Sequence, residues 1–170
     1  MDVLLIRHAI AEPKADEGGT QPDDRLRELT PKGRRRMKRA AKGILYLVPT
    51  IDVLAASPLV RAAQTAEVVS KTYDGFSITP VPELEPGVAP DVVVEWLREN
   101  ETSGTVALVG HEPALSSLAT YLATAHHHPF LTLDKGGACL LETPAGVPPG
   151  EGRFVWLATS KQLRALGRRR

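Results

Sequence analysis

Four short apolar runs, separated from one another by segments with helical character, constrain the fold of this chain more than any other feature. They are Val3–Ile6, Val53–Ala56, Ile78–Val81 and Val106–Val109. Each run is rich in β-branched residues, alanine or leucine and is bounded by charged or turn-forming residues, which is typical of strands buried on both faces. We therefore predict an α/β sandwich around a mainly parallel sheet.

The segments between these runs carry helix start signals and apolar stripes. Two of them open with a hydroxyl side chain followed by proline, a combination that caps a helix and starts its first turn, at Thr30-Pro31 and Ser57-Pro58. The predicted helices span about 31–48, 58–72, 89–99 and a segment that begins after Pro113.

The last third of the chain has a different pattern, because three strand-like stretches follow one another with turn residues between them. They are Phe130–Leu133, Ala138–Glu142 and Arg153–Leu157, and we expect at least one of them to run antiparallel. A length of 170 residues fits a single domain, 1–170.

The net charge of +1 points to no particular class of partner, but the charges are unevenly distributed. Residues 32–42 hold seven bases and no acid, whereas residues 12–28 are rich in acids. The seven bases fall all around a helix, and no aromatic residue is interleaved for stacking on bases. We interpret them as a solvated face rather than a nucleic-acid site, and a docking role near a pocket stays open.

The cysteine count and the lengths of the apolar segments indicate where the protein is located, and the histidine pattern bears on metal binding. Cys139 is the only cysteine, so a disulfide within the chain is excluded, and we expect a reducing cytoplasm. No segment reaches the roughly 20 apolar residues that span a bilayer, so we expect a soluble protein without a membrane partner. The consecutive histidines 126–128 do not share a helix face and have no acid beside them, and we interpret them as an exposed loop rather than a metal site.

Chemically active side chains follow the predicted strands, at the edge where open α/β sheets bind ligands. In chain order they are Arg7-His8, Ser57-Pro58 with Arg61, Glu83 with Glu85, and Gly110-His111-Glu112. Either histidine segment alone is more often a surface feature or a capping turn. Their joint occurrence at one edge indicates a site. The polar loop from Glu12 to Asp24 lies just beyond it and could cover the pocket or contact the substrate.

Two arginines and two histidines in one place fit phosphate chemistry. Guanidinium groups match phosphate oxygens, and a neutral imidazole whose second nitrogen is fixed can attack phosphorus directly. Arg7, Arg61 and His111 could donate to the oxygens that gain negative charge in the transition state, so no metal or other cofactor is required. This hypothesis requires the rings of His8 and His111 to lie within a few ångströms of each other and to be open to solvent.

Four segments resemble the histidine phosphatase superfamily, which includes phosphoglycerate mutase-like enzymes. They fall in the expected order over residues 3–125, at 5–9, 29–33, 56–67 and 109–113. The short chain looks most like the SixA-type phosphohistidine phosphatases. The resemblance implies a three-layer α/β/α sandwich in which the strands before His8 and His111 are neighbours. It also implies that His8 is the nucleophile and that Arg7, Arg61 and His111 form the phosphate pocket.

The sequence departs from the family pattern at one position. It also does not determine which residue is the general acid. The usual Arg-His-Gly is Arg-His-Ala here, with Ala9 in place of the glycine. Larger members supply a carboxylate after the third strand, and Glu83 is the candidate, with Glu85 in reserve.

Three functions follow from this resemblance. The first is hydrolysis of protein phosphohistidine or another phosphoramidate, whose leaving group needs little protonation. The second is hydrolysis of a small phosphate monoester. The third is a phosphate-dependent binding module with little turnover. The expected partner is accordingly a phosphohistidine-bearing protein or a small phosphorylated substrate, and not nucleic acid.

Overall fold

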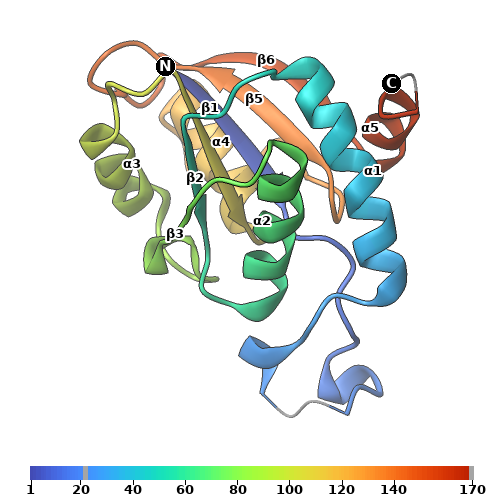
Figure 1. Ribbon diagram of the computed structural model, residues 1–170. Helices are drawn as coiled ribbons and strands as arrows, with labels where there is room; N and C mark the ends of the chain where they lie inside the picture. Colours follow the sequence, from blue (N-terminus) through green and yellow to red (C-terminus); the bar gives the residue numbers. More distant parts are fainter. Residues whose placement is uncertain (21–22, 169–170) are drawn as a thin grey trace.

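The computed structural model describes residues 1–20 and 23–168, which form one six-stranded sheet with helices on both faces (Figure 1). The strands lie side by side in the order β3-β2-β4-β1-β5-β6. They are β1 (Asp2–Arg7), β2 (Val53–Ala56), β3 (Ile78–Pro80), β4 (Thr105–Gly110), β5 (Ala138–Glu142) and β6 (Arg153–Ala158).

The sheet is mainly parallel, as the apolar runs predict. Strands β1, β2, β3 and β4 pair in parallel, whereas β5 runs antiparallel to β1 and β6 runs antiparallel to β5. The neighbours of β1 are therefore β4 on one side and β5 on the other. The expectation that the strands before His8 and His111 are neighbours is confirmed, and Arg7 pairs in register with Gly110.

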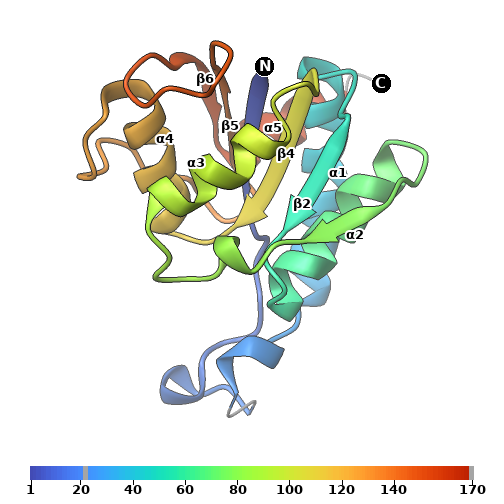
Figure 2. The same ribbon diagram turned by 90° about the vertical axis from the view of Figure 1, so that its left-hand side faces the viewer.

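The helices form two layers, one on each face of the sheet (Figure 2). Helices α1 (Pro31–Leu47), α2 (Val60–Thr72) and α5 (Ser160–Leu166) cover one face, and α3 (Pro90–Glu99) and α4 (Ala114–Thr124) cover the other. Side chains alternate between these layers along β1: Leu4 and Ile6 belong to the core under α1 and α2, and Val3 and Leu5 to the core under α3 and α4. The three-layer α/β/α sandwich is confirmed.

The predicted strand Phe130–Leu133 is wrong, since these residues form a loop. The polar groups of Leu133 bond to side chains instead of to a neighbouring strand. Its carbonyl accepts a hydrogen bond from the Arg7 guanidinium, and its N–H donates to the Glu112 carboxylate. A residue whose backbone is occupied in this way cannot join the sheet ladder.

Two helix predictions also differ from the structure. Helix α2 begins at Val60 rather than at Ser57-Pro58, with Leu59 as its N-cap. Ser57 Oγ instead lies 2.9 Å from His111 Nε2 and accepts a hydrogen bond from the Leu59 N–H at 3.4 Å. Helix α5 lies outside the predicted helices, although Thr159 and Gln162 form a capping box at its start.

Within the described residues no helix has the length and apolar character needed to cross a membrane.

Candidate active site

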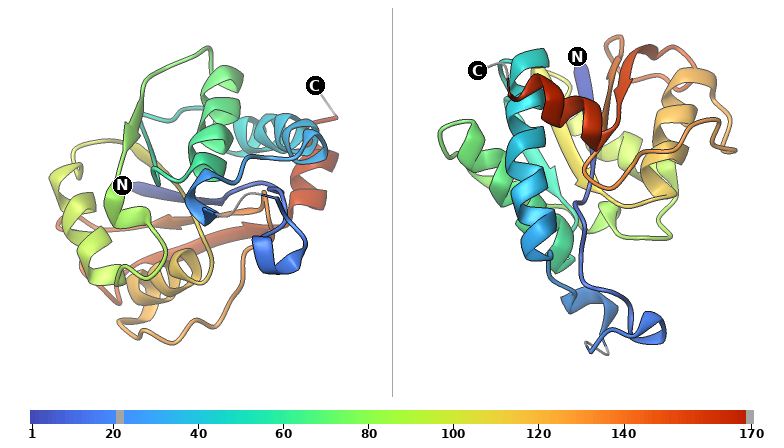
Figure 3. Two further views of the ribbon diagram at one scale, coloured as in Figure 1. Left: turned by 90° about the horizontal axis from the view of Figure 1, so that it is seen from below. Right: turned by 90° about the vertical axis from the view of Figure 1, so that its right-hand side faces the viewer.

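The carboxyl edge of the sheet brings His8 and His111 together. Figure 3 (left) shows the molecule from below the view of Figure 1, the side toward which β1 runs. His8 follows β1 and His111 follows β4, and the His8 N–H donates to the Gly110 carbonyl across the two strands. The centroids of the two rings are 5.1 Å apart, with 53° between the ring planes. The expected proximity of the two imidazoles is met, and it follows directly from the parallel pairing of their strands.

The His8 ring is oriented by the backbone next to it. Its Nδ1 lies 2.7 Å from the Ala9 carbonyl oxygen, and because a carbonyl only accepts, Nδ1 carries the proton. Nε2 is then the basic nitrogen of the neutral ring. Burial lowers the pKa of His8 to about 3, against the opposing effect of the Ala9 hydrogen bond and with help from nearby His111 and Arg61. The ring is therefore neutral at pH 7, the state that a nucleophile needs.

The His111 ring is oriented by a side chain, that of Ser57. Its Nε2 lies 2.9 Å from Ser57 Oγ, while its Nδ1 is buried and makes no hydrogen bond within the described part of the chain. Burial lowers the pKa of His111 to about 3, and the Arg61 guanidinium adds to that effect.

The two arginines of the predicted pocket are each fixed at their outer nitrogens. Arg7 donates from Nη1 to the Leu133 carbonyl at 2.7 Å. Arg61 donates from Nη1 to the Asp24 carbonyl at 2.7 Å and from Nη2 to Asp24 Oδ2 at 3.0 Å. In both residues Nε is buried and unpartnered as far as the described residues go.

These observations leave three buried nitrogens without a partner in the described regions, and all three belong to this site: Arg7 Nε, Arg61 Nε and His111 Nδ1. Buried polar groups in folded proteins are nearly always hydrogen-bonded, so an unpartnered cluster of this kind matches a ligand rich in acceptor oxygens. Two of the three groups are cationic, which favours an anion. A phosphoryl group supplies both features.

The requirement that both rings lie open to solvent is not met, so the case for phosphate chemistry rests on the proximity of the two rings and on the three unpartnered nitrogens. His8 is 6% exposed and His111 is 2% exposed, so both rings are almost fully enclosed by the protein. Asp24 contributes to this cover, because it reaches Arg61 from the loop that follows β1. The prediction that this loop could cover the pocket agrees with that contact, although residues 21–22 of the loop lie outside the described residues.

The two predicted acids, Glu83 and Glu85, have different surroundings in the structure. Glu83 lies half-buried in the 3-10 helix η3 (Pro82–Leu84), directly after β3. Glu85 receives two hydrogen bonds from Arg25, which lower the pKa of its carboxyl.

Asp24 is the residue that the sequence patterns did not single out. Its carboxylate also accepts from Arg27 Nε at 2.8 Å. Burial opposes ionisation, but the Arg61 and Arg27 guanidinium groups outweigh it and lower the pKa of Asp24. No periodicity or cap marks this position, and only the general expectation of a polar loop over the pocket pointed to it.

Thr65 is a second such residue, one turn after Arg61 on α2. Its hydroxyl accepts from the Ala9 N–H at 3.0 Å and donates to the Arg61 carbonyl at 2.6 Å. Thr65 thus ties the backbone beside His8 to the helix that carries Arg61. Its place inside the family-like segment 56–67 was the available signal.

The histidines 126–128 lie exposed in the loop after α4, away from the strand ends that form the site.

Comparison with known proteins agrees with this geometry. The family model of the histidine phosphatase superfamily (branch 1) matches residues 3–85. An uncharacterized protein of Picosynechococcus sp. (strain PCC 7002) is 34% identical over 154 residues, covering 85% of this chain and 87% of that protein.

Solved structures extend the likeness to the whole fold. A protein histidine phosphatase SixA complexed with tungstate has a TM-score of 0.81 at 25% identity, covering 96% of this chain and 99% of that chain. An alpha-ribazole phosphatase from Shigella flexneri has a TM-score of 0.71 at 16% identity, covering 94% and 97%, and shows the shared fold alone. From its sequence and from the arrangement of its strands and strand ends, this chain belongs to the histidine phosphatase superfamily as a compact phosphatase of the SixA type.

Proposed function

We propose that the protein hydrolyses phosphohistidine or another phosphoramidate through a phosphohistidine intermediate on His8. One observation carries the proposal: a neutral His8 ring with Nε2 as its basic nitrogen lies beside three buried, unpartnered nitrogens of Arg7, Arg61 and His111. The similar SixA structure is a complex with tungstate, a tetrahedral oxyanion, which supports an anionic ligand for a protein of this fold.

The reaction that fits these groups has two displacement steps. Nε2 of His8 attacks phosphorus in line, a P–N bond forms, and the bond to the leaving group breaks with its electron pair going to that group. Water then attacks the phosphorylated His8 and returns the imidazole, with phosphate as product. Arg7, Arg61 and His111 donate to the equatorial oxygens, where fixed donors in a buried site stabilise the charge that develops.

The state of the nearby carboxylates favours a phosphoramidate substrate. Asp24 and Glu85 both have lowered pKa values because guanidinium groups pair with them, so both are ionised at pH 7 and cannot donate a proton. An alcohol leaving group would depart as a costly alkoxide without such a donor, whereas an imidazole leaving group is much less basic.

A small phosphate monoester is the second candidate substrate, because relatives with this fold include an alpha-ribazole phosphatase and a phosphoserine phosphatase. Glu83 is the residue that distinguishes the two candidates, since it follows β3 at the carboxyl edge of the sheet, is half-buried and forms no ion pair within the described residues. We expect Glu83→Gln to lower kcat for p-nitrophenyl phosphate by about 10²-fold if Glu83 is the acid, and to leave phosphoramidate hydrolysis within about twofold. Parallel assays of both substrates, with Glu95→Gln on the exposed face of α3 as the control, measure this difference.

Trapping of the intermediate tests the reaction itself. Wild-type protein incubated with labelled phosphoramidate in a chelator should acquire acid-labile, base-stable label on His8. His8→Ala should acquire none and should lose turnover by about 10⁴-fold or more. Equal labelling of the variant would remove the proposal, and phosphate binding without turnover in the wild type would instead support a binding module.

The cytoplasmic setting and the absence of a cofactor stay predictions. They are supported by the single cysteine, which is buried, and by the fixed cations that take the place of a metal in the proposed reaction.

A further inference from the structure

A cavity of about 450 Å³ opens beside Arg7, and its walls carry an excess of positive charge. Apart from Arg7, its charged lining residues are Arg36 of α1, Lys135, Lys161 and Arg164 of α5, and a single carboxylate, Asp134. The cavity therefore adjoins the proposed phosphate pocket through a shared arginine.

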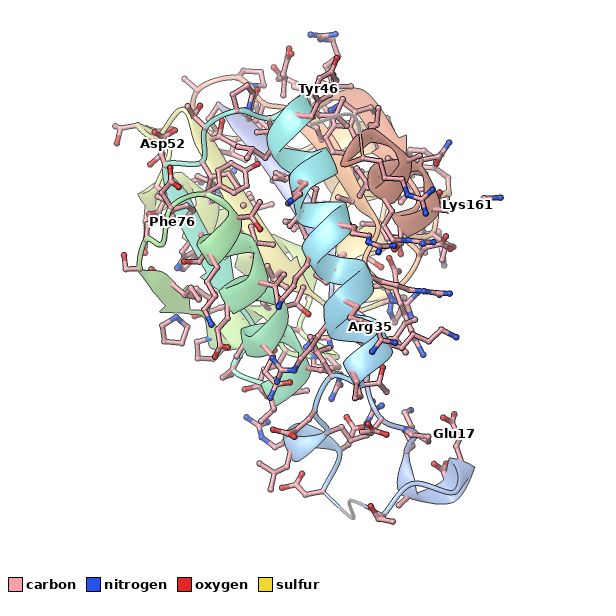
Figure 4. All side chains as sticks on the ribbon, turned by 45° about the vertical axis from the view of Figure 1, so that its right-hand side comes forward. Glu17, Arg35, Tyr46, Asp52, Phe76 and Lys161 are labelled. Atoms are coloured by element: carbon pink, nitrogen blue, oxygen red, sulfur yellow. The ribbon has the colours of Figure 1, made fainter. Side chains whose placement is uncertain are left out.

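A second cavity, of about 280 Å³, shares Arg36 and Arg164 with the first. Its five lining residues are all cations: Lys32, Arg35, Arg36, Arg39 and Arg164. Figure 4 shows nitrogen-tipped side chains of α1 and α5 extending to the same side of the molecule, around the labelled Arg35 and Lys161. The two cavities together are called the basic groove below.

Among the residues that the structure describes, the cations of the basic groove form no ion pair. Each ion pair within the described residues involves one of five other arginines: Arg25, Arg27, Arg61, Arg98 and Arg153. Like charges gathered on one face repel one another, so the groove is electrostatically complementary to a molecule with several negative charges.

The walls of the groove are fixed relative to His8. The Gly136 N–H, beside Lys135, lies 3.1 Å from both the Arg7 and the His8 carbonyl oxygens. Helix α1 touches the chain after His8 so closely that a Cβ on Gly33 would lie 2.0 Å from the Ile10 oxygen. An anionic ligand in the groove would therefore be held at a set distance from the nucleophile.

We propose that the basic groove binds an acidic segment of the protein whose phosphohistidine is hydrolysed at His8. This inference rests on the proposed function and specifies its substrate class. Lys32 and Arg39 are about 10 Å apart along α1, at 1.5 Å per residue, so the groove is longer than one anionic group requires. A polypeptide fits better than a nucleic acid, because no lining residue of either cavity is aromatic and able to stack on bases.

Two phosphohistidine peptides test the proposal, one with glutamates flanking the phosphohistidine and one with alanines. We expect the wild type to hydrolyse the acidic peptide with the higher kcat/KM. The double variant Arg36→Gln/Arg164→Gln should raise KM for the acidic peptide about tenfold at unchanged kcat, since exposed charge pairs contribute modestly and add. Turnover of the alanine peptide and of phosphoramidate should stay the same.

A charge-matched control separates docking from general attraction. Lys38→Gln/Lys71→Gln removes the same charge from a different cavity, between α1 and α2, and should leave KM for both peptides unchanged. Equal effects of the two double variants would overturn the proposal that the basic groove binds an acidic segment. Equal kcat/KM of the wild type for the two peptides would overturn it as well. Neither result would contradict the proposed reaction at His8.

A binding experiment without turnover distinguishes failure of the groove proposal from failure of the proposed function. Fluorescence anisotropy of a labelled hexaglutamate peptide with His8→Ala should show binding that Arg36→Gln/Arg164→Gln weakens about tenfold. Absence of that binding, or tighter binding of a single-stranded oligonucleotide of equal charge, would reject an acidic polypeptide as the partner. Failure of both phosphohistidine peptides and of phosphoramidate as substrates would reject the proposed function instead.

Discussion

In Arg7 and in Arg61, some guanidinium nitrogens hold the side chain in place and another faces the site. Their outer nitrogens bond to carbonyl groups and, for Arg61, to the Asp24 carboxylate, while Nε stays buried and unpartnered among the described residues. A donor that is fixed before the ligand arrives needs no reorganisation during the reaction. Asp24 is thus placed to aim Arg61 rather than to react.

Replacing Asp24 tests this positioning. Asp24→Asn removes the negative charge that holds Arg61 Nη2 and keeps the shape of the side chain. We expect kcat/KM for phosphoramidate to fall about tenfold, because charged hydrogen bonds contribute more than neutral ones. Asp24→Glu should restore part of the loss, which a purely structural role would not predict.

The control for this prediction is Asp16→Asn, in the exposed 3-10 helix η1 (Ala15–Glu17), which should change nothing. Higher activity of Asp24→Asn would contradict the prediction, since it would mean that the Asp24 carboxylate competes with phosphate for Arg61.

At the scale of elements, the four parallel strands could be predicted from the sequence, whereas the loop at 130–133 could not. Apolar runs located the four parallel strands, because burial on both faces leaves a continuous hydrophobic signature. Phe130–Leu133 carries the same signature, but the backbone of Leu133 bonds to the Arg7 and Glu112 side chains rather than to a neighbouring strand. Such partners come from distant parts of the chain and leave no local pattern.

Helix α5 illustrates the same limit. It is seven residues long and packs against α1 through Gly43, where a Cβ would lie 2.0 Å from the Leu163 oxygen. The glycine is visible in the sequence, but the element that it accommodates lies more than 100 residues later.

Gly43→Ala tests that packing. The added methyl group must push α5 away from α1, and we expect a loss of stability of about 1–3 kcal/mol or more. Urea unfolding followed by circular dichroism measures the loss, with Lys38→Ala on the exposed side of α1 as the control. Stability equal to wild type would show that the two helices part without cost. The phosphoramidate kcat of the folded protein should be unchanged.

At the scale of the molecule, parallel pairing explains why the site residues could be predicted. Side chains that follow parallel strands gather at one edge, so Arg7, His8, Arg61 and His111 could be grouped before their distances were known. The burial of the two rings could not be predicted, because it depends on packing against distant parts of the chain, such as that of His111 against Ser57. The catalytic roles of these residues stay predictions.

Burial of both rings also sets how the whole molecule responds to acid. The pKa values of His8 and His111 are about 3 in the folded protein and near 6.5 when unfolded. Between these values the unfolded chain binds more protons, so stability is complete above about pH 6.5 and falls as the pH drops toward 3. Each histidine should contribute up to about 1.4 kcal/mol per pH unit to this loss.

Urea unfolding at pH 7, 6, 5 and 4 measures the effect. His8→Asn and His111→Asn should each flatten the acid dependence, whereas His126→Asn in the exposed loop should not. An unchanged slope in both site variants would show that the two rings titrate in the folded protein as they do in the unfolded chain.

The central position of β1 has a consequence for how such a molecule can change. With β4 and β5 hydrogen-bonded on either side, the strand that presents His8 cannot shift alone, whereas the cationic faces of α1 and α5 lie outside the sheet. On the proposed role of the basic groove, recognition and reactivity are separable: we expect that exchanging outward-facing residues on these helices redirects the choice of partner while a minimal phosphoryl donor is still turned over at the original rate.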